Sequence, residues 1–441
     1  MSDANLIGLV SVALMLLLIY AGMYVAIALT MLSFIGVWII RDDAGIAANL
    51  LALAVNDAIS DYVFGVVPLF VLMGLLVAVA DIGKDTFEVA NQLLRRLRGG
   101  LGVATVAANA VFAAITGISI ASAAVFTKVA VPEMLRHGYA PRFSVGVVAG
   151  SSVLGMLIPP SLLLILYGIL TERSIGDLFI AGIVPGIVLA VSFAIGIVLM
   201  ATFRPHWIYA NEAAEYSAKE APLMGAAEIA GKMLPIVLLI ALVLGGIYGG
   251  LFTPVEAGAV GAAGSLVLAF VKRRLDGQTL WKVLVETAHI TAAVCFLIIS
   301  ASLYSRMLAI SGVTELLRGL IVDTGFGFAG LLTVFIVVVL ILGTILDSSS
   351  IMLITIPLVL PALIGFNTDL IWFGIVTVIA IEIGLLTPPF GIAVFVIKST
   401  LGPDSPITLK DIFAGAFPFA VIMFVVLLLV IAVPQLATML L

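Results

Sequence analysis

Long apolar runs, separated by short polar stretches, follow one another along almost the whole chain. A bilayer-spanning helix needs about 20 mostly apolar residues, so the sequence predicts an all-α integral membrane protein with about ten spans. Because 63% of the residues are hydrophobic and 10% are charged, the composition excludes a soluble enzyme, a disordered protein and a nucleic-acid-binding protein with a basic face. The runs lie near residues 5–20, 22–40, 64–82, 101–135, 143–170, 178–203, 233–251, 254–271, 283–304, 325–365, 370–397 and 412–439.

The first apolar run is expected to remain in the protein as a membrane span. A secretory signal begins with basic residues and ends at a small-residue cleavage site. The opening residues MSDANL carry only the charge of Asp3, and no cleavage site is evident. We therefore interpret Leu6–Tyr20 as a retained span.

Two of the runs are predicted to be re-entrant hairpins. The runs 101–135 and 325–365 are too long for one span and short for two spans with a loop. Lys and Arg favour cytoplasmic loops, and both ends of 101–135 are basic, so this run is expected to enter from the cytoplasm and return. The run 325–365 lies between Asp323 and Asp369, with no Lys or Arg between 319 and 397, which predicts a hairpin from the opposite side.

The same charge rule orients the rest of the chain. It places the polar stretch 204–232 in the cytoplasm and both termini outside. Three basic residues, Arg41, Arg306 and Arg318, fall on the expected outer side and so depart from the rule.

The two halves of the chain resemble each other at a constant offset of 229 residues. The matches are Ser119 with Ser348, Pro132 with Pro361, Gly155 with Gly384, Pro159 with Pro388, and Pro160 with Pro389. Such ordered matches predict an internal repeat, with halves 1–203 and 233–441 joined by the linker 204–232. Since the charges orient the copies oppositely, we expect two inverted-topology repeats, an arrangement typical of secondary transporters.

Each half carries a Pro-Pro pair inside an apolar run, in 143–170 and in 370–397. Proline has no amide hydrogen, so these pairs are expected to release the carbonyls of Gly155 and Met156, and of Gly384 and Leu385. A helix kink is the simpler interpretation of one such pair. Two pairs at repeat-related positions favour broken helices whose free carbonyls coordinate an ion.

The polar centres of the two hairpins supply further oxygen atoms. Hydroxyl and carbonyl oxygens are hard neutral ligands suited to Na⁺, and half-helix ends add partial charges of either sign. Packing or back-bonding to the helix is the alternative role for a serine in a membrane helix. The expected Na⁺ ligands are Ser119, Ser122, Gly155 and Ile158 in the first half, and Asp347, Ser348, Ser350, Gly384 and Thr387 in the second.

Two acids lie inside apolar sequence, which makes both functional candidates. Asp347 is expected either to ligate a cation or to cap a hairpin helix. Glu382 is expected either to support the break beside Gly384 or to bond a neighbouring helix. Their repeat partners are Ile118 and Val153, so any role is asymmetric.

Motifs for an enzyme are absent from the sequence. There is no GxxxxGK loop for ATP, no HExxH zinc motif and no GxGD protease motif. An acid pair of Asp347 and Glu382 lies 35 residues apart without a nucleophile signature, so we expect a protein that is not an enzyme.

Six short motifs stand out along the chain: SVLGMLIPPS at 152–161, YG at 167–168, LFIAGIVPG at 178–186, TPVEAGAVG at 253–261, GTILD at 343–347 and EIGLLTPP at 382–389. In combination they resemble the large membrane subunit of tripartite ATP-independent periplasmic (TRAP) transporters. The resemblance implies a multi-pass protein of the bacterial inner membrane. It also implies an elevator-type fold of the ion transporter superfamily, in which a mobile domain carries hairpins and broken helices past a scaffold that includes 22–40 and 254–271.

The resemblance also implies partners and cargo. A periplasmic substrate-binding protein would deliver a small organic acid, such as a C4-dicarboxylate or sialic acid, and an inward Na⁺ gradient would drive uptake. A small four-helix membrane subunit is expected as a separate polypeptide. The alternative is a stand-alone cation-coupled carboxylate transporter of the same superfamily, which needs no binding protein.

The solute is expected to bind between the two hairpin tips. No Lys or Arg lies there, so an anion would depend on neutral donors, helix ends and bound Na⁺. The expected solute contacts are Ser119, Pro160, Ser348, Ser349 and Pro389.

Overall fold

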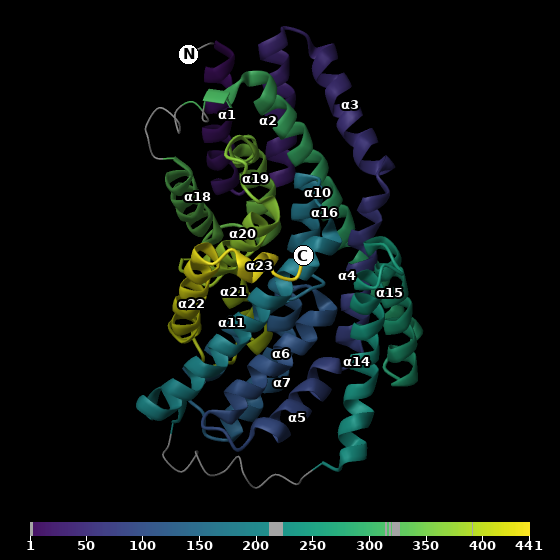
Figure 1. Ribbon diagram of the computed structural model, residues 1–441, viewed down its shortest axis with the longest axis vertical. Coiled ribbons are helices and arrows are strands. Elements are labelled where there is room, and N and C mark those ends of the chain that lie inside the picture. Colours follow the sequence, from purple (N-terminus) through teal and green to yellow (C-terminus); the bar gives the residue numbers. More distant parts are fainter. Residues whose placement is uncertain (1–2, 211–223, 314, 317–318, 320–326, 390) are drawn as a thin grey trace.

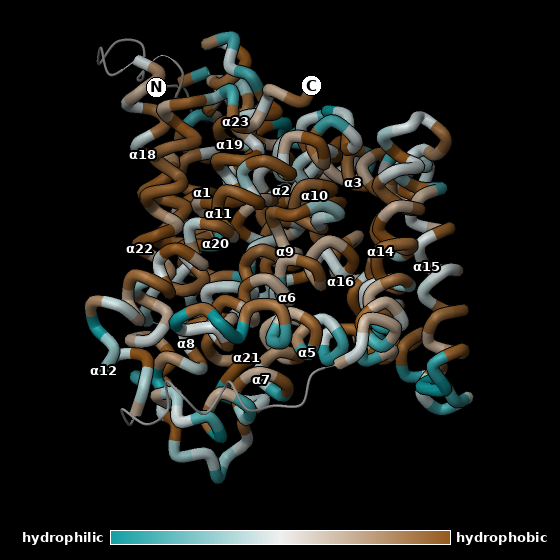
Figure 2. Tube along the Cα trace, turned by 60° about the horizontal axis from the view of Figure 1, so that its bottom comes forward, coloured by the Kyte–Doolittle hydropathy of each residue, from teal (hydrophilic) through white to brown (hydrophobic). Residues whose placement is uncertain are grey.

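The structure, a computed structural model, is helical almost throughout (Figure 1). It describes residues 3–210, 224–313, 315–316, 319, 327–389 and 391–441. Within these ranges, nine helices are long and apolar enough to cross a membrane. Hydrophobic residues fill the middle of the helices, and hydrophilic ones gather at helix ends and loops (Figure 2). The chain therefore has the architecture of a multi-span membrane protein.

The helices of the first half begin with a group that precedes the first hairpin. They are α1 (Asp3–Tyr20), α2 (Val25–Arg41), α3 (Ala44–Ser60), the 3-10 turn η1 (Tyr62–Gly65), α4 (Val66–Val79) and α5 (Ile82–Leu94). The remaining ones are α6 (Gly100–Thr116), α7 (Ser119–Arg136), α8 (Pro141–Ser152), α9 (Leu154–Leu157), α10 (Leu162–Thr171), α11 (Ile175–Phe203) and α12 (Pro205–Ile208).

The second half follows the same order of long helix, hairpin and interrupted helix. Its helices are α14 (Ala226–Tyr248), α15 (Pro254–Val271), α16 (Gly277–Ser311), α18 (Gly327–Gly343), α19 (Ser348–Gly365), α20 (Leu370–Leu385), α21 (Ile392–Leu401), α22 (Leu409–Ala432) and α23 (Gln435–Thr438). Local sequence fixes several starts: Thr253 and Glu256 form a capping box at α15, with Pro254 as its first residue.

Two helices of the first half are missing from the sequence-based expectation. Asn56 and Asp57 interrupt the apolar pattern of α3, yet Asp57 pairs with Arg306 of α16 at 2.6 Å. This ion pair gives one of the basic residues on the expected outer side a partner. Arg318, and Asp323 beside the second hairpin, lie outside the described residues. Helix α5 is amphipathic and carries charges along its outer face, so it forms no long apolar run.

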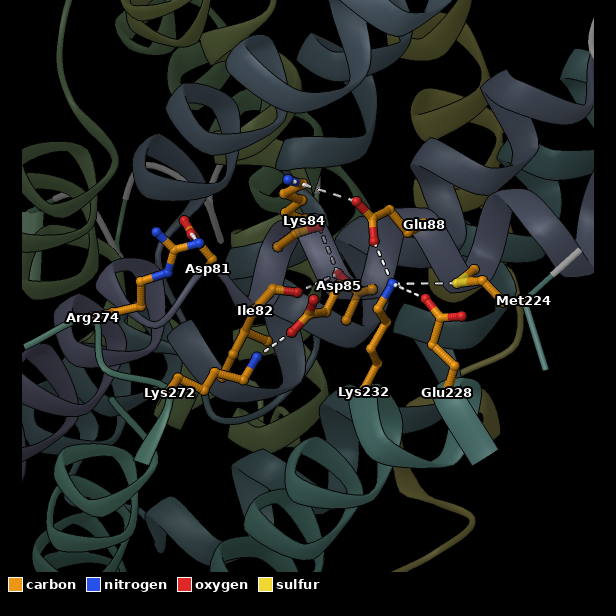
Figure 3. A network of polar contacts seen from close by, with 12 residues as sticks. Asp81, Ile82, Lys84, Asp85, Glu88, Met224, Glu228, Lys232, Lys272 and Arg274 are labelled. Carbon is orange, nitrogen blue, oxygen red and sulfur yellow. Dashed lines mark hydrogen bonds and ion pairs between the residues drawn. The ribbon is translucent and has the colours of Figure 1, made fainter. Parts of the chain in front are cut away.

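The charged face of α5 is tied to α14 and to the end of α15 (Figure 3). Gln92 and the backbone of Met224 exchange two hydrogen bonds of 2.8 and 2.7 Å. The opposite face packs on the first hairpin, where a side chain at Gly83 would meet Phe112 and Val125. The ion pairs join Asp81 to Arg274, Asp85 to Lys272, and Glu88 to both Lys84 and Lys232, which also bonds Glu228.

Replacing Lys232, the centre of this network, is expected to destabilise the protein. Lys232→Gln removes contacts of 2.6 Å to Glu88 and 3.1 Å to Glu228. Because these groups are partly exposed, we expect a loss of about 1 kcal/mol that shrinks in high salt. Thermal unfolding of the purified protein at two salt concentrations measures it. Lys84→Gln is the control, since Lys84 lies 3.8 Å from Glu88 and is 57% exposed. Equal midpoints for Lys232→Gln and the unchanged protein at low salt would contradict the assignment.

Candidate functional site

The first hairpin turns at residues 117–122, here called the first tip. Helix α6 ends at Thr116, Gly117 adopts a left-handed φ of 64°, and α7 begins at Ser119. Only a residue without a side chain fits here easily, because a Cβ on Gly117 would also collide with the Pro160 carbonyl. The sequence therefore forms a tight turn between two helices whose ends meet at this point.

The first break, residues 158–161, packs directly on the first tip. The Leu162 amide donates to the Gly117 carbonyl at 3.2 Å, and a Cβ on Gly155 would lie 3.1 Å from the backbone of Ile118 and Ser119. Both Pro159 and Pro160 are buried. The backbone contacts therefore bring Gly155 beside Ser119, and Pro160 beside Gly117.

Carbonyl groups in the first break are only partly free. The Ser161 hydroxyl donates to the Met156 carbonyl and accepts the Leu164 amide at 3.2 Å, so it caps α10 and occupies one carbonyl that the sequence predicted to be released. In a continuous helix the Gly155 carbonyl would accept the amide of residue 159. Residue 159 is proline and has no amide hydrogen to donate. The role of Ser161 went unrecognised, although a serine directly after a Pro-Pro pair is a helix N-cap signal.

The hydroxyl groups of the first tip lack internal partners. Ser122 is fully buried, and its Oγ atom has no hydrogen bond among the described residues. Ser119 is 3% exposed and likewise bonds no described group through its hydroxyl. The α7 N-terminus has no side-chain cap, because Ile118 occupies that position. Unpaired buried hydroxyls are uncommon, and beside a helix end they are suited to a bound ligand.

The second hairpin turns at residues 344–350, here called the second tip. The Asp347 carboxylate caps α19, accepting the Ser350 amide at 3.1 Å and the Ser350 hydroxyl. Of the two roles expected for Asp347, the structure therefore places it as a cap. Leu346, Asp347 and Ser350 line a cavity of about 480 Å³, whose other walls are the α1–α2 turn and α16.

Helix α20 supports the second tip through a buried acid. The Ser348 hydroxyl donates to Glu382 Oε1 at 3.0 Å, and the two residues are 6% and 1% exposed. Glu382 therefore bonds a neighbouring helix, one of the two roles expected for it. The sequence gave no direct signal for this pair, because the two residues meet only through tertiary packing.

The second break follows Leu385 and ends at Ile392, and it differs from the first. The Gly384 carbonyl is not released as predicted, because it accepts the Thr387 amide at 2.9 Å. The Thr387 hydroxyl donates to the Ile383 carbonyl at 2.8 Å. Pro389 is exposed and Ser349 half-buried, whereas the prolines of the first break are buried. Gly384 instead gives close helix contact, since a Cβ there would lie 2.7 Å from Gly343 Cα.

The two hairpins and the two interrupted helices interlock. Helix α10 packs on α19 of the second hairpin, and the equivalent α21 packs on α7 of the first. Helix α9 also contacts α20, so the two breaks belong to one packed unit.

Comparisons with known proteins agree with this arrangement. A family model described as "Tripartite ATP-independent periplasmic transporter, DctM component" matches residues 12–436. The C4-dicarboxylate TRAP transporter large permease protein DctM of Pseudomonas aeruginosa is 34% identical over 391 residues, 87% of each chain. The sialic acid TRAP transporter large permease protein SiaM of Vibrio cholerae is 29% identical over 422 residues, covering 95% of this chain and 94% of that protein.

A solved structure shares the fold at low sequence identity. The YdaH transporter of Alcanivorax borkumensis superposes with a TM-score of 0.54 at 15% identity, covering 85% of this chain and 87% of that one. The likeness extends to the fold alone.

Proposed function

This chain belongs to the DctM-component family of TRAP transporters, and on that premise we propose that it is the large permease subunit of a Na⁺-coupled importer of a small organic acid. As a member of this family it is a multi-pass protein of the bacterial inner membrane and not an enzyme. The observation that carries the proposed coupling is the unpartnered Ser122 hydroxyl, fully buried where the first tip meets the first break.

The first Na⁺ site is proposed at this junction. Ser119 and Ser122 would supply hydroxyl oxygens, and Gly155 and Ile158 would supply carbonyl oxygens. These are hard neutral ligands, and the close backbone approach at Gly155 places it beside Ile118 and Ser119. Na⁺ would satisfy the Ser122 hydroxyl, which has no hydrogen-bond partner among the described residues.

The second Na⁺ site is proposed at the second tip. Asp347, Ser348, Ser350, Gly384 and Thr387 would contribute to it. Asp347 and Ser350 line a cavity large enough to admit the ion, and the Gly384 carbonyl retains a second lone pair beside its hydrogen bond.

An elevator mechanism with two inverted repeats is proposed for transport. The repeat-related packing of α10 on α19 and of α21 on α7 supports it, because each interrupted helix contacts the hairpin of the other half of the chain. We call α6–α10 with α18–α21 the block, and α1–α4 with α14–α16 the scaffold. The block would carry Na⁺ and solute past the scaffold as one body, since repeat-related contacts fix both tips within it.

The solute is proposed to be a small carboxylate such as a C4-dicarboxylate or sialic acid, the substrate classes in the names of the two relatives. It would lie between the tips, near Ser119, Pro160, Ser348, Ser349 and Pro389. Na⁺ would bind first, because no Lys or Arg is present at the tips to hold an anion. A periplasmic binding protein would deliver the solute, and a small four-helix subunit would join this chain in the membrane.

Uptake into proteoliposomes tests the function. The vesicles would contain this chain with its small subunit, and the binding protein would be added outside with a panel of labelled carboxylates. We expect uptake of one class only when Na⁺ is higher outside. Uptake that continues without the binding protein would favour a stand-alone carrier. Uptake that is indifferent to the Na⁺ gradient would reject the coupling.

Removing a first-tip hydroxyl tests the first ion site. Ser119→Ala should raise the Na⁺ concentration for half-maximal uptake by about tenfold, or about 1.4 kcal/mol. Thr127→Ala on the same helix is the control, because the Thr127 hydroxyl only bonds the Ala123 carbonyl. An unchanged Na⁺ requirement in well-folded Ser119→Ala would remove Ser119 from the site.

A further inference from the structure

The bond between Ser348 and Glu382 restricts what the second tip can bind. Ser348 opens α19, and Glu382 lies on α20 two residues before Gly384. Their side chains meet at 3.0 Å, with the serine as donor, and both are buried. This contact therefore belongs to the interior of the block and not to its surface.

A serine hydroxyl has one proton and two lone pairs. Since Ser348 directs its proton to Glu382, its Oγ atom can offer only lone pairs to a ligand. Lone pairs coordinate a cation, whereas a solute carboxylate needs a donated proton. In this arrangement Ser348 is suited to coordinate Na⁺, and it cannot donate a hydrogen bond to the carboxylate of a solute that lies beside it.

The first tip has no acid at the position equivalent to Glu382. The repeat partner of Glu382 is Val153, which is buried and whose apolar side chain cannot accept a hydrogen bond. The Ser119 hydroxyl bonds no described group, so it can donate a proton to a solute while its lone pairs remain available to a cation.

The helix ends at the two tips differ in the same sense. At α19 the carboxylate of Asp347 already occupies the N-terminus, while α7 has Ile118 there and no side-chain cap. A helix N-terminus attracts anions, and an acid already bound to it repels a second one. The side-chain bonds and the helix caps therefore both assign the anion to the first tip.

We propose that Glu382 is a positioning residue that holds the Ser348 hydroxyl with its lone pairs toward the cation. It thereby directs Ser348 to Na⁺ and leaves hydrogen-bond donation to the solute carboxylate to the first tip. This inference rests on the proposed function and deepens it, because it assigns different ligand interactions to two otherwise similar tips.

Na⁺ alone is the probe for this inference. The thermal midpoint of the purified large subunit with its small subunit would be followed as NaCl replaces choline chloride at constant ionic strength, since a bound ion stabilises the folded state. Glu382→Val, which copies Val153, should raise the half-maximal Na⁺ concentration about tenfold. Glu382→Gln should stay within about twofold, because its amide oxygen still accepts the Ser348 proton.

A double variant separates positioning from other roles. Ser348→Ala should weaken the Na⁺ response, and adding Glu382→Val should weaken it no further, because Glu382 acts through Ser348. Folding of each variant would be checked by its midpoint in choline chloride. If Glu382→Val does not fold, Glu382→Gln and Ser348→Ala decide the question.

The outcomes distinguish this inference from the function beneath it. A normal Na⁺ response in Glu382→Val, a loss in Glu382→Gln as large as in Glu382→Val, or additive losses in the double variant would each overturn the positioning role alone. No stabilisation of the unchanged protein by Na⁺ would overturn the proposed coupling, and this inference with it.

Discussion

Gly384→Val is expected to abolish transport. A Cβ at this position would lie 2.7 Å from the Cα atom of Gly343 and 3.2 Å from the Leu340 carbonyl, both on α18. Backbone atoms of a packed helix cannot move aside as a flexible side chain would, so valine must push the second hairpin away from α20. The displacement would separate Ser348 from Glu382 and open the second tip.

Uptake by the reconstituted system should fall more than about 100-fold in Gly384→Val, because overpacking costs up to about 3 kcal/mol, which corresponds to that factor. Gly384→Ala should show a smaller loss of uptake. Gly245→Val is the matched control, because a Cβ at Gly245 of α14 meets nothing within 4 Å. Co-purification of the small subunit would verify that the variant assembles. Full uptake by assembled Gly384→Val would show that the close contact between α18 and α20 is dispensable.

Joining the first tip to the scaffold is expected to stop transport reversibly. Val71 of α4 and Ile118 of the first tip line the same small void, so cysteines there can be bridged by a short thiol-reactive reagent. Cys295 would first be replaced by alanine to leave only the introduced thiols. If the block must slide past α4, the bridge should reduce uptake to background, and reduction by dithiothreitol should restore it.

Two further pairs control for the chemistry of the bridge. Thr30 and Ser300 lie within the scaffold, with their hydroxyl oxygens 2.8 Å apart. Asn109 and Ser151 lie within the block, with a hydrogen bond of 2.6 Å. Bridges at these pairs should leave uptake intact. If the three cross-linked variants, each with one bridge, all show the same uptake, movement of the block past α4 is ruled out.

The composition and the apolar runs predicted the all-helical, multi-span architecture that surrounds the site. The Pro-Pro pairs mark where α9 and α20 end, because proline removes an amide donor wherever it occurs. The two hairpin tips could be predicted because each lies within an apolar run too long for one membrane span. These features are local, so they can be read from a single chain.

Tertiary features could not be predicted in the same way. Charged residues such as Asp81 and Glu88 make the sequence of α5 resemble a polar loop. Their partners, Arg274 just after α15 and Lys232 on α14, are known only from the structure. The Gly343 contact with Gly384, and the bond from Ser348 to Glu382, join residues about 35 to 40 positions apart. The Pro-Pro rule was also wrong in one detail, since it predicted a free carbonyl at Gly384 where the carbonyl accepts the Thr387 amide instead.

Distances between spin labels test most directly whether both tips travel together past the scaffold. Labels at Arg136 and Ile364, exposed at the ends of α7 and α19, would report on the block. Labels at Ile59 of α3 and Trp281 of α16 would report on the scaffold. We expect the Arg136–Ile364 distance to stay constant, and the Ile59–Ile364 and Trp281–Arg136 distances to change together, when Na⁺ and a transported solute are added with the binding protein. A change between Arg136 and Ile364, with both scaffold distances fixed, would contradict the account.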